Sequence, residues 1–407
     1  MEKRLLVVCD MFTPPAFLPR VRFFCDYLQQ HGWQLDILTE TPREHVELPY
    51  NIYSISTESS NVWLWRFRNI VSLFHDFKSA TLYKAYAQQL SEKKYDAVFT
   101  STFFSFPLPT AARIAKQQNL PLIVDLRDIP EQAPPFTYLE HHLNGAFGRW
   151  LMRLYTQINI RRRNMVLKQA THVTSVSPWH VDFLKQWNPN TQLIYNGYDE
   201  QIFTPARVAT EKFTISYTGK FYGMPLQDVS LLFDALSQLF NEQKVNADDF
   251  EINWYTDDSS ARLIKQTINE ESIASVFKFH SLVFHTQIPE ILNRSSLALV
   301  LSNKAQTNGN HGIMTTKFFE ALGCECPVLC VRSDEECLAQ TIQETRIGIA
   351  AADIDACKEF ILEKYEEWQR NGMTTSKVNI ESKQRFARQA QAKRLEELLL
   401  QSTRQSK

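Results

Sequence analysis

The stretch GNHGIMTTKFFEALGCECPVLC, residues 309–330, predicts a turn, a helix and a buried strand in direct succession. Gly309 and Gly312 allow the backbone to approach a ligand closely. A threonine can cap a helix over 315–322, and the apolar run after Pro327 is typical of a strand that is covered on both faces. This succession is the repeating unit of a parallel α/β sheet.

The same alternation extends in both directions along the chain. Around the quoted stretch we expect strands at 213–217, 250–255, 276–280, 297–301, 328–331 and 347–350, with a helix at 226–240. Toward the N-terminus, strands are expected at 4–9, 35–38, 96–101, 122–125, 172–176 and 193–195, with helices at 20–31, 108–118, 146–168 and from 178. Residues between 38 and 96 are less regular. The pattern predicts an α/β protein of two Rossmann-like domains, whose parallel sheets face a central cleft.

A polar, proline-containing link over 203–211 marks the predicted domain boundary. We therefore expect an N-terminal domain over 1–205 and a second domain over 206–378. The remaining residues, 379–407, contain an amphipathic helix from Gln384 to Leu400. This helix is expected to pack back on the N-terminal domain.

Composition narrows the class of protein. Hydrophobic residues make up 44% and charged residues 22% of the 407, with a net charge of −1, so nucleic acid is not an expected partner. The first apolar run begins too early for a signal peptide, and no apolar stretch approaches the ~20 residues of a membrane span. The seven cysteines do not suggest a disulfide framework. We expect a cytoplasmic protein.

The sequence disfavours several other kinds of functional site. No Gly-x-Gly-x-x-Gly follows the first strand and no Walker loop is present, which disfavours dinucleotide oxidoreductases and P-loop enzymes. Cys326 and Cys330 flank a predicted buried strand, so we interpret them as small apolar residues rather than zinc ligands. Asp353-Ile-Asp355 precedes a helical pattern and is better explained as a helix cap than as a metal motif. The sequence predicts no essential metal.

The quoted stretch carries chemistry that suits a nucleotide. The free N–H groups and positive dipole end of the predicted helix suit a diphosphate, and Lys317 adds a cation. Glu320 lies on nearly the same helix face, where its carboxylate can accept hydrogen bonds from two ribose hydroxyls. Taken alone, the stretch also fits a capped helix with a solvated Lys/Glu pair. Its expected place at the cleft favours the functional interpretation.

The chain resembles, over nearly its whole length, the retaining glycosyltransferases of family 4, which have the GT-B fold. The resemblance assigns donor binding to the residues around the helix start, with Glu320 as the ribose ligand: Gly312, Met314, Thr315, Thr316, Lys317 and Glu320. The family carries a pair of glutamates separated by seven residues. Here Gly312 stands where the first of them would be, so the usual sugar-contacting carboxylate is absent.

Further blocks match the family. Gly219 and Lys220 resemble the turn after the first strand of the donor domain, which makes Lys220 a second phosphate ligand; the alternative is a surface lysine. Residues 175–178 and 196–199 resemble the interdomain stretch, where Asn196-Gly197 predicts a tight turn.

On the acceptor side, the loop that contains Pro15 and Arg20 resembles the family's first loop, although 16–18 is Ala-Phe-Leu rather than the usual paired glycines. Asp125, Arg127 and Asp128 follow a buried strand, like the family's Asp-x-Arg-Asp segment. Such a cluster could orient an acceptor and take part in catalysis, or could be a self-satisfied ion pair that closes the loop.

The resemblance implies transfer of a sugar from a nucleotide diphosphosugar, which is a co-substrate, with no further cofactor. The acceptor would be a glycan or a lipid-linked glycan precursor. Two stretches, 61–74 and 149–168, combine aromatic and basic residues and suggest attachment to an anionic membrane at its cytoplasmic face; the alternative is a helix packed on its sheet with a solvated basic face.

Two other functions stay open at this point. A nucleotide-sugar epimerase shares the two-domain fold. A non-catalytic subunit of a polysaccharide assembly complex would fit the missing glutamate at Gly312.

Overall fold

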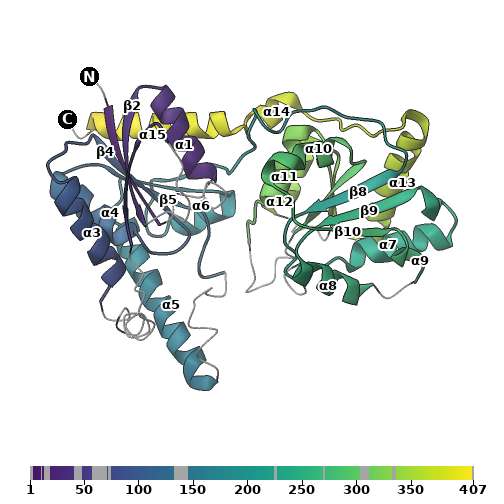
Figure 1. Ribbon diagram of the computed structural model, residues 1–407, viewed down its shortest axis with the longest axis horizontal. Coiled ribbons are helices and arrows are strands. Elements are labelled where there is room, and N and C mark those ends of the chain that lie inside the picture. The colour runs from purple at the N-terminus through teal and green to yellow at the C-terminus, as the bar shows by residue number, and fades with distance from the viewer. Residues whose placement is uncertain are drawn as a thin grey trace. The chain divides into compact units, whose positions relative to one another are not determined.

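The computed structural model describes residues 3–10, 12, 19–40, 48–56, 71, 75–132, 145–223, 227–268, 271–302, 311–331 and 336–405. They form two compact units, one made of 1–194 and 392–407, the other of 195–391. Figure 1 draws the elements of both units and labels many of them.

The first unit contains a seven-stranded parallel sheet in the order β3-β2-β1-β4-β5-β6-β7. Its strands are β1 Lys3–Cys9, β2 Trp33–Glu40, β3 Asn51–Ile55, β4 Ala97–Thr102, β5 Leu122–Leu126, β6 His172–Ser175 and β7 Thr191–Leu193. One face packs against α1 (Pro19–Gln30) and α15 (Arg388–Gln405). The other face is covered by α3 (Phe77–Gln89), α4 (Leu108–Gln118), α5 (Ala146–Leu167) and α6 (Pro178–Leu184).

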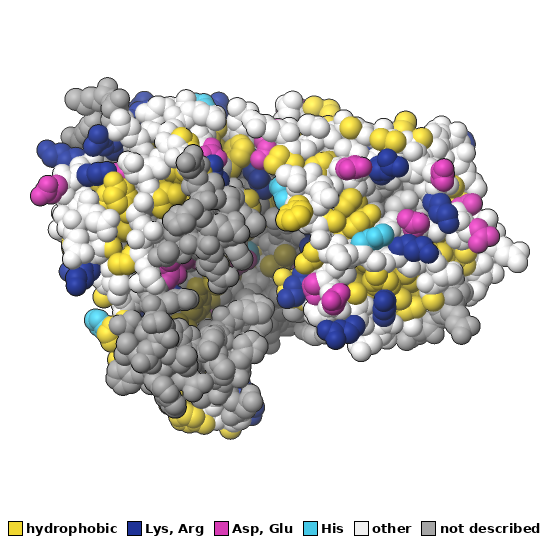
Figure 2. Space-filling view, viewed as in Figure 1, with side chains coloured by type: hydrophobic (Ala, Val, Ile, Leu, Met, Phe, Trp, Pro, Cys, Tyr) yellow, Lys and Arg dark blue, Asp and Glu magenta, His cyan; other side chains and the backbone are white. Residues whose placement is uncertain are grey.

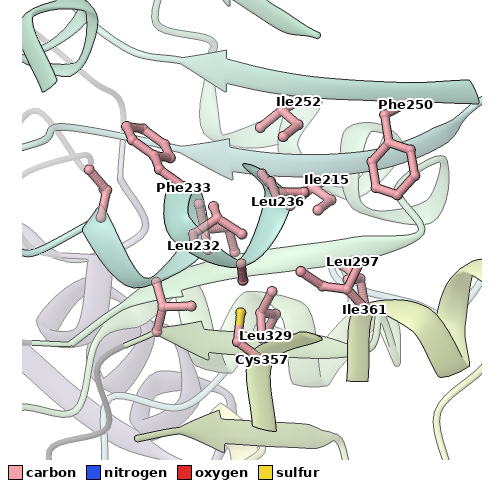
Figure 3. Packing of buried hydrophobic residues seen from close by; sticks show 14 of the residues in the cluster. Ile215, Leu232, Phe233, Leu236, Phe250, Ile252, Leu297, Leu329, Cys357 and Ile361 are labelled. Atoms are coloured by element: carbon pink, nitrogen blue, oxygen red, sulfur yellow. The ribbon is translucent and has the colours of Figure 1, made fainter. Parts of the chain in front are cut away.

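The second unit contains a six-stranded parallel sheet in the order β10-β9-β8-β11-β12-β13. Its strands are β8 Phe213–Thr218, β9 Phe250–Tyr255, β10 Phe277–His280, β11 Leu297–Leu301, β12 Val328–Val331 and β13 Gly348–Ala351. The core of one face joins the strands to α7 (Ser230–Asn241), α8 (Asp258–Thr267), α9 (Glu271–Ala274) and α13 (Ile354–Asn371), and Figure 3 shows its centre. The other face packs against α10 (Ile288–Asn293), α11 (Thr316–Cys324) and α12 (Cys337–Thr345). A short helix, α14 (Ile380–Gln384), precedes α15.

The predicted fold class is therefore confirmed: both halves are parallel sheets with helices on both faces. The structure adds β3 and α3 to the stretch between 38 and 96 that the sequence left irregular. Their apolar pattern is weak for a physical reason. β3 is an edge strand that is only partly covered, and α3 buries only Ser79, Leu82, Ala85 and Tyr86.

The division between the units lies at 194/195, before the predicted boundary at 205/206. The reason is packing, because Tyr198 and Phe203 are buried in the core of the second unit. The chain returns to the first unit at its end, where Leu395, Leu398 and Leu399 of α15 pack with β1 and α1.

The Asn196-Gly197 segment does not close a tight turn as predicted. Gly197 has a φ of +66°, and Tyr198 forms a parallel bridge with Ala387 just before α15. A Cβ atom at Gly197 would lie 2.5 Å from the carbonyl oxygen of Phe386. The glycine is thus required by the close approach of two distant segments.

Two smaller predictions can also be compared with the structure. Cys326 and Cys330 are buried in the apolar core beside α11, as small apolar residues, and burial raises the pKa of the Cys326 thiol. Asp353 caps α13, where its carboxylate accepts a hydrogen bond from the N–H of Ala356 at 2.9 Å. Among the described residues, no helix is both long enough and apolar enough to cross a membrane.

Candidate functional site

In the second unit, the predicted donor residues gather around the start of α11. Thr315 has extended backbone angles, φ −69° and ψ 143°, and its side chain accepts no capping hydrogen bond. The first turn therefore directs N–H groups away from the helix without a side-chain cap, which is the arrangement that binds anions at helix N-termini. Thr316 is exposed in this first turn.

Lys317 and Gly219 meet although they are far apart in sequence. The Lys317 Nζ lies 5.1 Å from the centre of the Tyr217 ring, near the end of β8. A Cβ atom at Gly219 would lie 2.9 Å from Lys317 Cε and 3.0 Å from its Nζ, and Gly219 has a φ of +118°. Burial lowers the pKa of Lys317, and nearby Glu320 opposes that effect. Glycine is thus the residue that leaves room for this lysine.

Lys220 is in a different setting from Lys317. Its side chain is exposed, and its Nζ lies 5.6 Å from the centre of the Tyr222 ring. Its carbonyl oxygen accepts a hydrogen bond from the Tyr217 hydroxyl at 2.7 Å, which ties the turn to β8. The described contacts of Lys220 therefore fit a surface lysine as well as a phosphate ligand.

Glu320 lies one turn into α11 and is buried. Burial raises the pKa of its carboxyl, while Lys317 and Arg388 counteract this. Its Oε1 lies 3.6 Å from Nε2 of His285, whose ring packs edge-on against Phe203 at 5.0 Å. His285 was not predicted, since a single histidine between a strand and a helix has no local pattern that marks it.

The loop before α11 is held by another residue that the sequence did not suggest. Glu336 accepts hydrogen bonds from His311 Nδ1 at 2.7 Å and from the N–H of Gly312 at 3.3 Å. A carboxylate from another segment thus contacts the backbone of Gly312, the residue that stands where the first glutamate is expected. Met314, predicted to bind donor, places its side chain in the apolar core beside α11.

In the first unit, Arg20 and Asp125 pair with each other. Arg20 Nη2 lies 2.9 Å from Asp125 Oδ1, and both side chains are buried. Ser101 and Thr174 donate to the same carboxylate at 2.8 and 2.7 Å, from the strands on either side of β5. Because its oxygens accept hydrogen bonds from three side chains, Asp125 ties Arg20 to the ends of the neighbouring strands.

Arg127 and Asp128 lie just beyond the end of β5. Arg127 Nη2 is 3.8 Å from Asp10 Oδ2, and its guanidinium lies 5.9 Å from the Phe103 ring centre. Asp128 is exposed. These two side chains are therefore better placed than Asp125 to contact a substrate. Pro15 and Gly309, both named from the sequence, lie outside the described residues.

A cavity of about 790 Å³ opens on another part of the second unit. It is bordered by β8, β9 and α10, with Ser216, Asn253 and Tyr255 among its lining residues. None of the predicted site residues lines it. Among the residues that the structure describes, no three His, Cys, Asp or Glu side chains are grouped so that they could hold a metal ion.

Comparisons with known proteins cover both units. Residues 19–197 match the model of a glycosyl transferase 4-like domain, and residues 249–399 match that of a glycosyl transferase-like domain. A search of curated proteins finds no significant match.

Solved structures share the fold over the full chain. Sucrose-phosphate synthase from Thermosynechococcus elongatus is 16% identical, with a TM-score of 0.67 over 98% of this chain and 99% of that one. HepE of Anabaena in complex with UDP and glucose is 14% identical, with a TM-score of 0.63 over 98% and 99%. UDP-GlcNAc 2-epimerase from Methanocaldococcus jannaschii is 10% identical, with a TM-score of 0.53 over 98% and 99%. Identities this low show a common fold alone.

Proposed function

The chain belongs to the group 1 glycosyltransferases, of the family 4 type with the GT-B fold, and we propose the following reaction for it. It transfers a sugar from a nucleotide diphosphosugar to a hydroxyl group of a glycan or lipid-linked glycan precursor, and the anomeric configuration is retained. We place the reaction in the cytoplasm, a compartment that keeps cysteine side chains such as the seven of this chain reduced.

The observation that carries the proposal is the cluster of Lys317, Gly219 and Glu320 at the start of α11. A diphosphate at this helix end would meet the first-turn N–H groups and the Lys317 ammonium. The buried carboxylate of Glu320 would accept hydrogen bonds from the ribose hydroxyls one turn further on.

The same groups support catalysis of the transfer step. Negative charge builds up on the leaving diphosphate as the bond to the sugar breaks. A cation and helix N–H groups that are already in place stabilise this charge without reorganising, and no metal ion is needed in the proposed reaction. Measuring turnover in the presence of a chelator tests metal independence.

Acceptor binding is proposed for the first unit. Arg127 and Asp128 lie just beyond the end of β5. Unlike Asp125, they are not part of a buried network of hydrogen bonds among the described residues. Arg127 would bind an anionic or hydroxyl group of the acceptor, and Asp128 would orient the attacking hydroxyl.

Glu320→Ala tests the function directly. Loss of hydrogen bonds to a charged group should weaken nucleoside diphosphate binding roughly 10- to 150-fold and reduce transfer at least as much. Glu359→Ala, an exposed carboxylate on α13, is the matched control and should change neither. Nucleotide affinity that is the same in both variants would contradict the proposed donor site.

A nucleotide-sugar epimerase is the second candidate, because one of the structurally similar proteins is a UDP-GlcNAc 2-epimerase. An epimerase converts the donor without an acceptor, so NMR of the donor sugar after incubation with the protein alone distinguishes the two. A non-catalytic subunit would bind the nucleotide and leave every donor unchanged. With a transferase, NMR of the product also reports whether the configuration is retained.

A further inference from the structure

Helix α5 carries a stripe of exposed side chains that the proposed transfer reaction does not use. Its 22 residues contain five arginines and no Asp or Glu, although the whole chain has a net charge of −1. Steps of three or four residues place seven exposed side chains on one face of the helix and its C-terminal end. We call these residues the α5 stripe: Phe147, Trp150, Arg153, Gln157, Arg161, Met165 and Lys168.

The opposite side of α5 is fastened to the first unit. Arg163 is buried and paired with Glu131, and Asn159 accepts a hydrogen bond from Ser105 at 2.7 Å. Leu167 lies in the core beneath α4. Because these contacts fix the rotation of the helix about its axis, the α5 stripe is held toward solvent. Figure 1 shows the first half of α5 extending beyond the strands of its own sheet.

The apolar members of the α5 stripe are unusually exposed. Phe147 is 67%, Trp150 56% and Met165 57% accessible, and the rings of the first two lie 5.8 Å apart. Figure 2 shows hydrophobic and basic side chains side by side at the free end of α5, at the bottom of the view. Large aromatic side chains exposed together mark an interaction surface.

The surface continues beside Met165 into a groove of about 360 Å³ between α4 and α5. Pro109 and Ala112 give it apolar walls, and Arg113 and Lys116 are basic residues at its border. Its acidic residue, Asp76, is occupied in capping α3, where it accepts from the N–H of Ser79 at 3.0 Å. The groove thus repeats the combination of apolar and cationic groups seen on the α5 stripe.

We propose that the α5 stripe binds the surface of an anionic lipid bilayer. A bilayer interface accommodates Trp and Phe at the level of the headgroups while lipid phosphates pair with Arg and Lys. The stripe spans about 30 Å along the helix, so its cations and aromatic rings can contact the bilayer together. The inference extends the proposed function, because a bilayer would present a lipid-linked acceptor to the first unit.

The test is binding of the full-length protein to vesicles, measured by flotation. Vesicles of phosphatidylcholine alone are compared with vesicles of equal parts phosphatidylcholine and phosphatidylglycerol. Each Lys or Arg near an anionic surface contributes about fivefold to binding. The triple variant Arg153→Gln, Arg161→Gln and Lys168→Gln should therefore bind the anionic vesicles about a hundredfold more weakly.

A second variant separates the apolar part of the interaction from its charge. Phe147→Ser with Trp150→Ser should lower binding to the anionic vesicles at least tenfold while the remaining attraction stays sensitive to salt. The matched control removes three exposed charges from α15 and should bind like the natural sequence: Lys393→Gln, Arg394→Gln and Arg404→Gln. Thermal unfolding of every variant checks that each one folds.

Binding to neither vesicle, or equal binding by the control and the α5 stripe variants, would overturn the proposal. So would a dimer in solution that the stripe variants abolish while vesicle binding persists, since the occupant would then be a second copy of the chain. Nucleoside diphosphate affinity, measured on the same variants, should be unchanged. A protein that binds vesicles but no nucleotide would refute the proposed function and leave this inference intact.

Discussion

Replacing Gly219 with alanine perturbs the candidate donor site without touching a charged group. The new methyl carbon would lie 2.9 Å from Lys317 Cε and 3.0 Å from its Nζ. Carbon atoms in contact normally lie about 3.5–4.0 Å apart, so the end of the lysine side chain must move by roughly 0.5–1 Å. The φ of +118° at this position also strains any residue with a Cβ atom.

These two effects have different consequences. Backbone strain should lower the free energy of unfolding by about 1–3 kcal/mol. A charge-assisted hydrogen bond from Lys317 to a phosphate is worth about 1.5–3 kcal/mol, and a displaced ammonium would retain part of it. We therefore expect nucleoside diphosphate binding to weaken by about 1 kcal/mol, or roughly fivefold.

A double-mutant cycle with Lys317→Ala separates the two effects. Titration calorimetry with UDP, GDP and ADP gives the affinities, and chemical denaturation gives the free energies of unfolding. If Gly219→Ala acts on binding through the lysine, it should have no further effect on affinity in the Lys317→Ala background. The loss of stability should persist there.

Gly372→Ala provides a matched control within the same unit. Gly372 also has a positive φ, +70°, but a Cβ atom there would lie nearest to the Cβ atom of Ala209, at 3.2 Å, and no atom of Lys317 is among its close neighbours. This variant should lose stability and keep its nucleotide affinity. The reasoning would be refuted if Gly219→Ala bound nucleotide normally, or if its effect on affinity were the same with and without the lysine.

Three further predictions follow from the two units. Burial places the pKa of Lys317 below 10.5, so nucleotide affinity should fall as the pH rises toward that value, whereas Lys317→Arg, which stays protonated, should show no such fall in a pH series of titrations. Asp125→Asn leaves the Arg20 charge buried without its carboxylate, so the free energy of unfolding from chemical denaturation should fall by about 3 kcal/mol while nucleotide affinity stays unchanged. A loss of transfer without a loss of stability would instead assign Asp125 to catalysis. Glu336→Gln weakens the hydrogen bond that the Gly312 N–H donates to this side chain, so sugar transfer should fall about tenfold while nucleoside diphosphate affinity stays the same. If transfer and affinity fell equally, Glu336 would have no role specific to the sugar.

Much of the candidate donor site could be predicted from one stretch of sequence. Thr315, Lys317 and Glu320 belong to a single helix start, so their mutual placement follows from helix geometry. His285 and Glu336 could not be found in this way. His285 lies just before α10 and Glu336 just before α12, and both reach the site only because these helices pack in the same core as α11.

For Asp125 in the first unit, the partners that the structure shows could not be found from the sequence. Its place at the end of a buried strand left two interpretations open, a role at the substrate or an ion pair that closes the loop. The register of β4, β5 and β6 places Ser101 and Thr174 on either side of it, and Arg20 completes the network. No local pattern reveals that three distant residues will donate to one carboxylate.

The sequence by itself determined the two parallel sheets, because alternating apolar runs and amphipathic segments can bury their apolar faces in few other ways. It also determined the start of α11, since a helix terminus depends on neighbouring residues. Only the tertiary structure decided that Gly219 makes room for Lys317 and that Tyr198 and Phe203 belong to the second unit. These contacts join residues far apart in the chain, and their geometry depends on how side chains fill the space between packed elements.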